Sequence, residues 1–259
     1  MPTNLAAGPV YNRVPKVTVD FWLIKLMAVT MGETAADYLN VQLGLGLSTT
    51  SILMTIVLLG ALVWQFWQRR YVPAPYWLAV VLISIVGTLI TDNLVDNFHV
   101  PLIVTTVFFA VALAITFAVW FVVERTLSIH TVYTTRREAF YWLAILFTFA
   151  LGTAAGDLVA EQFSLGYLAT GILFGMIIAS LSLGYFGLGL NNILAFWLVY
   201  ILTRPLGASF GDLLSQPRQY GGLGLGTIVT SALFLLIIAA VVVYMSVRHE
   251  GEELVEAPE

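Results

Sequence analysis

"FWLIKLMAVTMGETAAD", at residues 21–37, recurs three more times along the chain with its main positions in register. Each copy begins with an aromatic residue followed by Trp and Leu, has Gly ten residues after the Trp, and ends in Asp five residues later. Because the 259 residues include only seven Trp, this four-way match identifies an internal repeat. The other copies are "YWLAVVLISIVGTLITD" (76–92), "YWLAILFTFALGTAAGD" (141–157) and "FWLVYILTRPLGASFGD" (196–212).

The composition is that of a membrane protein. Hydrophobic residues make up 59% of the chain and charged residues 10%, whereas soluble domains carry about 25% charged residues. A membrane span needs roughly 20 mostly apolar residues, and the absence of Cys excludes disulfides and thiolate metal sites. We therefore expect an all-α integral membrane protein, with a lipid bilayer and no nucleic acid as its partner. Eight transmembrane helices are predicted near 20–39, 48–67, 75–95, 102–123, 138–159, 166–184, 191–213 and 225–247.

Each repeat holds two predicted helices, so every copy enters the membrane in the same orientation. Such parallel repeats are related by an axis along the membrane normal, which predicts a bundle with pseudo-two-fold or four-fold symmetry. The expected divisions are an N-terminal cytoplasmic segment (1–19), repeats 1 and 2 (20–125), a basic cytoplasmic linker (126–137), repeats 3 and 4 (138–248) and an acidic disordered tail (249–259).

Basic residues fall almost entirely on one side of the predicted helices. The other side has only Arg218. Cytoplasmic loops are enriched in Lys and Arg, so both termini are expected to be cytoplasmic. The residues on the basic side are Arg13, Lys16, Arg69, Arg70, Arg125, Arg136, Arg137 and Arg248.

The fourfold aromatic-Trp-Leu, Gly and Asp pattern resembles a family of bacterial inner-membrane proteins that is built from tandem repeats of unknown function. The resemblance extends over nearly the whole chain, apart from the first dozen residues and the acidic tail. It implies a location in the bacterial inner membrane, and it implies no particular activity.

Helical spacing arranges the polar residues of the four copies in layers. Trp to Asp is fifteen residues, about 22 Å of helix. With each Trp in an aromatic belt at the cytoplasmic interface, the Asp lies in the outer third of the membrane. The first layer contains Glu33, Thr88, Thr153 and Ala208, the second contains Asp37, Asp92, Asp157 and Asp212, and the third contains Val41, Asp96, Glu161 and Gln216.

A carboxylate at the centre of a membrane helix raises the free energy of insertion by about 2.5–3.5 kcal/mol. The carboxylates of these layers are therefore expected to face each other, water or a cation. Oxygen ligands favour hard cations such as Mn²⁺, Mg²⁺ or H⁺. The leading prediction is a cation transporter with a carboxylate-lined axial cavity and no catalytic residues. The candidate ion-binding residues are Glu33, Asp37, Asp92, Asp157, Asp212, Asp96, Glu161 and Arg204. The first five are the candidate ligands of a bound divalent metal ion.

Two basic residues lie within the predicted spans. Lys25 is expected to snorkel to the cytoplasmic interface. Arg204 lies deeper and is expected to set a barrier or to occupy the cation site when the cation leaves.

Several alternatives stay open. The Asp residues could be a structural lock, and the chain could be a membrane enzyme with paired carboxylates or a metal, or a structural or sensory protein. An organic cation held in an aromatic cage and a homo-oligomer are also open. The repeated Gly residues are expected to allow close helix packing, and "GLGLG" at 222–226 is expected to be a flexible connection.

Overall fold

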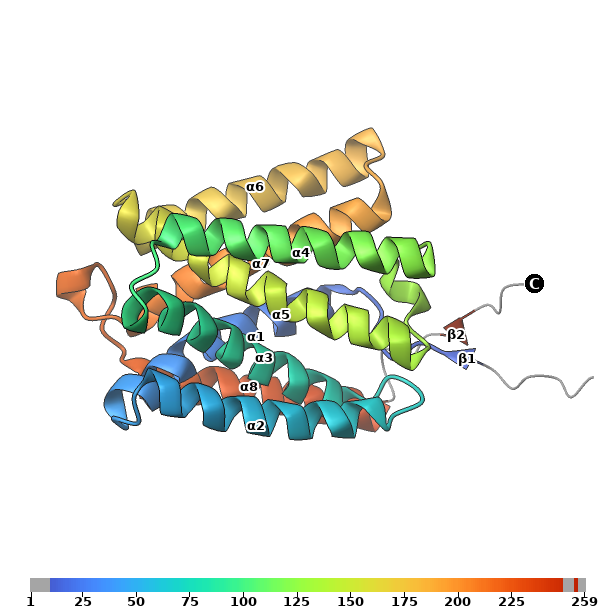
Figure 1. Cartoon of the computed structure of the whole chain (residues 1–259), viewed down its shortest axis with the longest axis horizontal. Coiled ribbons are helices and arrows are strands. Elements are labelled where there is room, and N and C mark those ends of the chain that lie inside the picture. Colours follow the sequence, from blue (N-terminus) through green and yellow to red (C-terminus); the bar gives the residue numbers. More distant parts are fainter. Residues whose placement is uncertain (1–9, 249–253, 256–259) are drawn as a thin grey trace, which may run out of the picture.

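The computed structural model describes residues 10–248 and 254–255, and in this part the chain is a bundle of eight long helices (Figure 1). All eight predicted segments are helical, with bounds close to those expected. The helices are α1 (Val19–Asp37), α2 (Leu47–Phe66), α3 (Pro73–Asp92), α4 (Leu102–Glu124), α5 (Thr135–Asp157), α6 (Tyr167–Leu188), α7 (Asn192–Ser215) and α8 (Thr227–Arg248).

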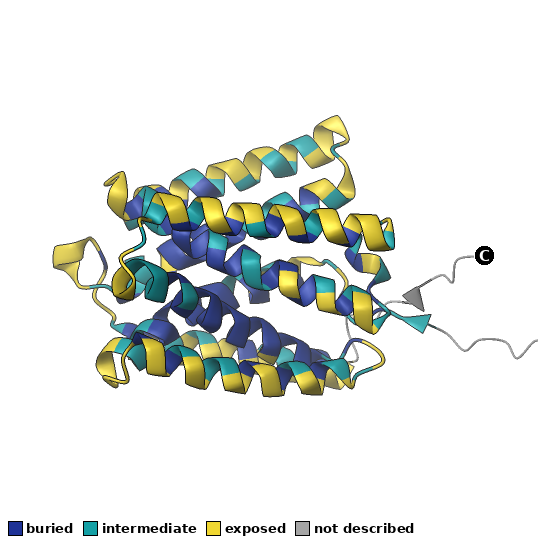
Figure 2. Cartoon of the chain, in the orientation of Figure 1, coloured by how far each residue is buried: buried dark blue, intermediate teal, exposed yellow. Residues whose placement is uncertain are grey.

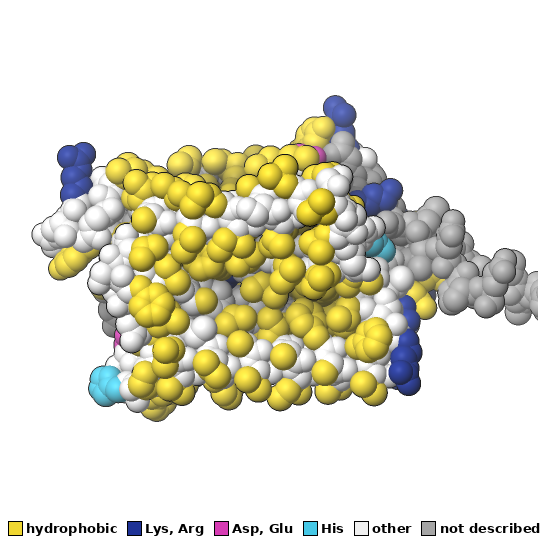
Figure 3. Space-filling view, turned by 90° about the horizontal axis from the view of Figure 1, so that it is seen from above, with side chains coloured by type: hydrophobic (Ala, Val, Ile, Leu, Met, Phe, Trp, Pro, Cys, Tyr) yellow, Lys and Arg dark blue, Asp and Glu magenta, His cyan; other side chains and the backbone are white. Residues whose placement is uncertain are grey.

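Seven of these helices are long and apolar enough to cross a membrane. The exception is α1, because its 19 residues include Asp20, Lys25, Glu33 and Asp37. The protein is therefore a membrane-type helical protein with seven clear candidate spans, and α1 is the one predicted span that carries too many charged residues to be among them. On the face shown in Figure 3, hydrophobic side chains cover the middle of the molecule and the Lys and Arg side chains lie at its two ends.

The eight helices form an inner ring and an outer layer. In the inner ring α1 packs on α3, α3 on α5, α5 on α7 and α7 on α1. Each outer helix packs mainly on the inner helix of the following repeat: α2 on α3, α4 on α5, α6 on α7, and α8 back on α1. Figure 2 shows this as a buried centre with exposed outer helices. In an apolar 18-residue stretch of each helix, 50–67% of the residues of α3, α5 and α7 are buried, against 6–22% for the outer helices.

The Gly of each copy lies where two inner helices approach most closely. A Cβ atom on it would come within 3 Å of the residue that stands seven positions after Trp in the next copy. The glycines are therefore required by close packing, as expected. The pairs are Gly32 with Ser84, Gly87 with Phe149, Gly152 with Arg204, and Gly207 with Val29, at 2.0, 2.8, 2.2 and 2.5 Å respectively.

The inner helices end differently in the fourth repeat. After α1, α3 and α5 the chain continues as a π-helical turn, at Tyr38–Gln42, Asn93–Asn97 and Leu158–Gln162. After α7 it leaves the helix at Gln216, which has extended backbone, and passes through a short 3₁₀ helix at Arg218–Tyr220. The end of the bundle that carries the four aspartates therefore has three similar turns and one different connection.

The opposite end is filled with aromatic side chains, which corrects the prediction of an interfacial belt. Trp77, Trp142 and Trp197 are at most 4% exposed, and Tyr76 contacts the rings of both Tyr141 and Trp142 across the α3–α5 interface. These three Trp residues do not form a belt because they lie on inner helices, which the outer helices cover, whereas Trp22 of the first repeat is half-buried. Periodicity alone does not distinguish inner from outer helices.

The segment before α1 crosses this aromatic end and joins two loops. Asn12 accepts a hydrogen bond from Tyr71 N and donates one to Ile129 O, both at 2.8 Å. Arg13 Nη1 lies 2.6 Å from the buried carboxylate of Glu138. Burial raises the pKa of Tyr71, whose hydroxyl accepts a hydrogen bond from the Trp77 indole.

Two short strands join the ends of the described chain. β1 (Val10–Tyr11) pairs antiparallel with β2 (Leu254–Val255), at the end of the bundle where the inner helices begin (Figure 1). The segments expected at 1–19 and 249–259 otherwise fall partly outside the described residues: this applies to 1–9, 249–253 and 256–259.

We expect Gly207→Ala to destabilise the protein by about 1–3 kcal/mol, because the added methyl group would overlap Val29 of α1. Gly60→Ala is the matched control, since Gly60 lies in an exposed part of α2 with open space around it. Denaturation in mixed detergent micelles, followed by tryptophan fluorescence, measures both. Equal stability of the two variants would contradict the close-packing role.

Candidate functional site

An ion pair lies at the centre of the inner ring. Arg204 of α7 is fully buried, and its Nη2 lies 2.8 Å from Oε2 of Glu33 on α1. The same nitrogen donates to Thr153 Oγ1 of α5 at 2.7 Å and to Thr88 Oγ1 of α3. Thr88 in turn donates to Glu33 Oε2 at 3.1 Å. All four inner helices therefore contribute to one hydrogen-bonded cluster.

This cluster is the predicted first layer, with one change. Glu33, Thr88 and Thr153 lie together as the spacing predicted, and Ala208 leaves room in the fourth copy. The guanidinium of Arg204 comes from one turn earlier on α7 and reaches this layer. The carboxylate and the two hydroxyls provide acceptors there, and a buried Arg without them would be costly.

The second predicted layer, one helical turn nearer the end where the inner helices finish, contains the four aspartates. Asp37, Asp92, Asp157 and Asp212 are each half-buried. Gln216 Nε2 donates to Asp37 Oδ2 at 3.2 Å. Coulombic repulsion links these carboxylates across the repeats. The carboxylates that repel one another are Glu33, Asp37, Asp92, Asp96, Asp157, Glu161 and Asp212.

The third layer forms the mouth of this region, where Asp96 and Glu161 are exposed. The cavity that reaches the aspartates has a volume of about 640 Å³, and Asp37 is the only one of the four aspartates that lines it. It lies beside the axis, between the end of α1 and the α7–α8 connection. This pocket is therefore off-axis, whereas the prediction was an axial cavity lined by all four aspartates, and Arg204 fills the centre of the layer below the aspartates.

Lys25 does not reach the interface, contrary to prediction. Its side chain is fully buried, and its Nζ donates to Tyr200 O at 2.5 Å and to Thr203 Oγ1. The ammonium also lies 3.9 Å from the centroid of the Tyr200 ring. A carbonyl, a hydroxyl and an aromatic face satisfy Lys25 inside the bundle, so it has no need to snorkel.

The predicted metal ligands do not form a metal centre. Across the described part of the chain, no group of three or more His, Cys, Asp or Glu side chains is arranged to hold a metal ion. Glu33 is committed to Arg204, and Asp37 accepts from Gln216. The five carboxylates predicted as metal ligands therefore lie in two layers, and the divalent metal ion finds no support in this geometry.

Two polar residues of the pocket were missed by the sequence analysis. Ser215 and Thr227 both line it, and each is at least 90% buried. Their hydroxyl oxygens have no hydrogen-bond partner within the residues described. Ser215 lies three residues after Asp212 in the repeat pattern, whereas Thr227 opens an outer helix and carries no repeat signal.

The repeat, the ring of helices and the buried polar layers define the class as a polytopic membrane-type protein assembled from four two-helix repeats. The chain belongs to the family described as Repeat of Unknown Function (DUF347), whose model matches residues 21–71, 75–126, 140–187 and 195–250. Each match covers one inner helix and the outer helix that follows it. The comparisons with curated proteins and with solved structures gave no match.

We expect Arg204→Met to destabilise the protein by about 3–5 kcal/mol, because Glu33 would be left as an uncompensated buried charge. The double variant with Glu33→Gln should recover part of this loss. Arg125→Met, at an exposed position, is the control. The measurement is chemical denaturation in detergent micelles, and equal losses in the single and double variants would argue against the ion pair.

Proposed function

We propose that this protein is a secondary transporter of a small cation in a bacterial inner membrane, with both chain ends on the cytoplasmic side. The single observation that carries the proposal is that the four inner helices form one ring and that each has its Asp at or near the same end of this ring. Ionisable side chains inside a membrane bundle typically line ion or proton paths.

A cation is the favoured substrate because the carboxylates outnumber the bases nearby. Arg204 hydrogen-bonds to Glu33, whereas the aspartates of the next layer repel one another. Carboxylates that share a site cannot all be ionised unless positive charge joins them. A bound cation or protons would provide that charge, so the aspartate layer favours binding of positive charge.

The packed interior between the aspartates and the end where the inner helices begin supports a transporter over a permanently open channel. Below the aspartates lies the Glu33–Arg204 cluster, then the buried Lys25, then the packed aromatic residues. Passage of a cation requires Arg204 to move away from Glu33, so that the cation replaces the guanidinium. Such exchange of one positive charge for another alternately opens and closes the site.

The orientation is supported by the distribution of basic residues. Arg13, Arg137 and Arg248 belong to the end where β1 and β2 pair, and Arg218 belongs to the end that carries the aspartates. Lys and Arg are enriched on the cytoplasmic side. The aspartate mouth would then face away from the cytoplasm.

Asp92→Asn and Asp157→Asn should each reduce cation flux into proteoliposomes by about tenfold or more, because each removes a carboxylate from the layer that attracts the cation. The assay uses a panel of Na⁺, K⁺, Mg²⁺, Mn²⁺ and alkylammonium ions, with an internal pH dye. Asp20→Asn is the control, since Asp20 is exposed at the opposite end.

Full flux in the two variants would reduce the aspartates to a structural role. If the wild-type protein moves none of the panel in either direction, the transport proposal is wrong.

A further inference from the structure

The off-axis pocket results from a break in the repeat pattern. In a π-helical turn each backbone N–H donates to the carbonyl five residues earlier. The residues five positions after Asp in the first three copies are Gln42, Asn97 and Gln162, and each has the backbone N–H that such a turn needs. The fourth copy has Pro217 at this position. Proline has no N–H, so α7 cannot end in the same turn.

The connection after Pro217 returns to the end of α7 and forms one wall of the pocket. Leu223 N donates to Leu213 O at 2.6 Å, and Gly226 N donates to Ser215 O at 3.2 Å. Gly222 is required here because its Cβ would lie 2.0 Å from Gln216 O. The glycine-rich segment expected to be a flexible connection is therefore hydrogen-bonded to the helix that it follows.

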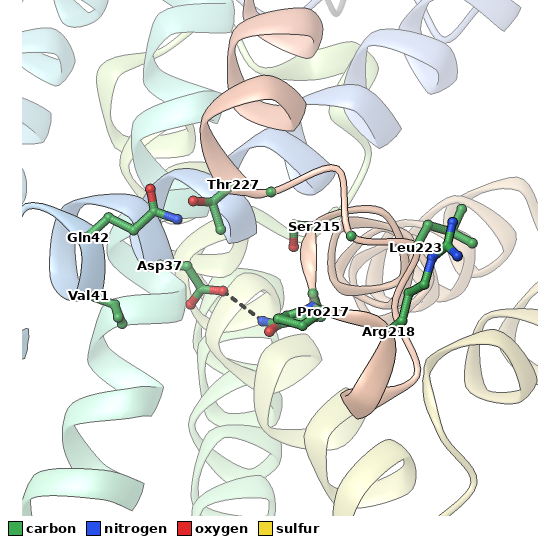
Figure 4. A pocket seen from close by; sticks show the side chains of 11 residues that line it. Asp37, Val41, Gln42, Ser215, Pro217, Arg218, Leu223 and Thr227 are labelled. Atoms are coloured by element: carbon green, nitrogen blue, oxygen red, sulfur yellow. Dashed lines mark hydrogen bonds between the residues drawn. The ribbon is translucent and has the colours of Figure 1, made fainter.

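Asp37, Ser215 and Thr227 are three of the oxygen-bearing side chains that line the pocket, and their surroundings differ. Figure 4 shows Asp37, Ser215 and Thr227 around this pocket. The side-chain amide of Gln216 donates a hydrogen bond to the Asp37 carboxylate. Ser215 is 4% exposed and Thr227 is 9% exposed, and within the described residues neither hydroxyl oxygen has a hydrogen-bond partner. A buried hydroxyl left without a partner costs about 1–3 kcal/mol, so these two groups favour a ligand that bonds to them.

We propose that this pocket binds the ammonium group of a small primary amine, which rests on the proposed transport function and names its substrate class. A primary ammonium has three N–H donors. Asp37 provides a charged acceptor, and the hydroxyls of Ser215 and Thr227 provide two neutral ones. The volume of about 640 Å³ exceeds what one ion fills, and Val41 and Leu223 offer apolar wall for a short hydrocarbon chain.

The same lining favours one positive charge over two. Asp37 is the one carboxylate among the lining residues, and Arg218 lies across the pocket from it (Figure 4). A divalent metal ion would need more negative ligands, and the far ammonium of a diamine would approach Arg218. The aromatic residues at the other end pack against one another, so the cage that sequence analysis left open does not form here.

The test is calorimetric titration of n-propylammonium chloride into the full-length protein in nanodiscs, with putrescine, MgCl₂ and neutral 1-propanol as comparison ligands. Propylammonium should bind most tightly. Ser215→Ala and Thr227→Val should each weaken it about tenfold, since each removes a hydrogen bond to a charged group. Ser246→Ala, at an exposed position of α8, is the matched control.

The variants are expected to fold normally, because each removes a hydroxyl that has no partner in the described chain. Unchanged melting with weakened amine binding supports the site. The inference is wrong if the wild-type protein does not bind propylammonium, or if both variants bind it as tightly as the wild type. It is also wrong if Mg²⁺ binds more tightly than propylammonium. If proteoliposomes transport an inorganic cation but the protein does not bind the amine, this inference is wrong and the transport proposal stands. If the protein binds the amine but transports no cation, the site is supported and the transport proposal is wrong.

Discussion

The guanidinium of Arg204 has to be neutralised in the middle of a membrane-type bundle, and this need organises the interior. An isolated buried charge is strongly unfavourable, so its neighbours must be acceptors. Glu33, Thr88 and Thr153 supply them from the other three repeats. The approach is possible because Gly152 lies against the aliphatic part of the Arg204 side chain. A single side chain thus couples all four repeats electrostatically.

The outer helices make this interior possible. Each covers the inner helix of the next repeat, and α8 closes the circle on α1. No repeat can therefore bury its own polar stripe alone, and the polar layers form only when the ring is complete. In a lipid environment this matters more than in water, because lipid offers no hydrogen bonds to an uncovered carboxylate. The cyclic order also explains why α1 tolerates Lys25, Glu33 and Asp37, because α3, α7 and α8 pack around it.

The repeat pattern was enough to predict the helices, the parallel arrangement and the register that places Glu33, Thr88 and Thr153 in one layer. The predictions failed where the location of a residue depends on the direction of its side chain or on which other helices pack against it. Lys25 and the Trp residues were assigned to the interface because a helix's own sequence does not say which other helices will cover it. The pocket was missed because it depends on Pro217 and on an outer-helix residue, Thr227. Neither belongs to the repeated motif, so a search for equivalent positions cannot find them.

The asymmetric positions are where chemistry becomes possible in this ring. Four identical repeats would place equal charges around an axis, and equal charges repel without selecting a ligand. Glu33 occurs in the first copy, Arg204 in the fourth, and Pro217 interrupts the turn that the other three copies share. Glu33 occupies the layer below Asp37, and Pro217 opens the pocket beside Asp37. Asp37 is therefore the aspartate whose surroundings differ from those of the other three, and it alone among them faces the pocket.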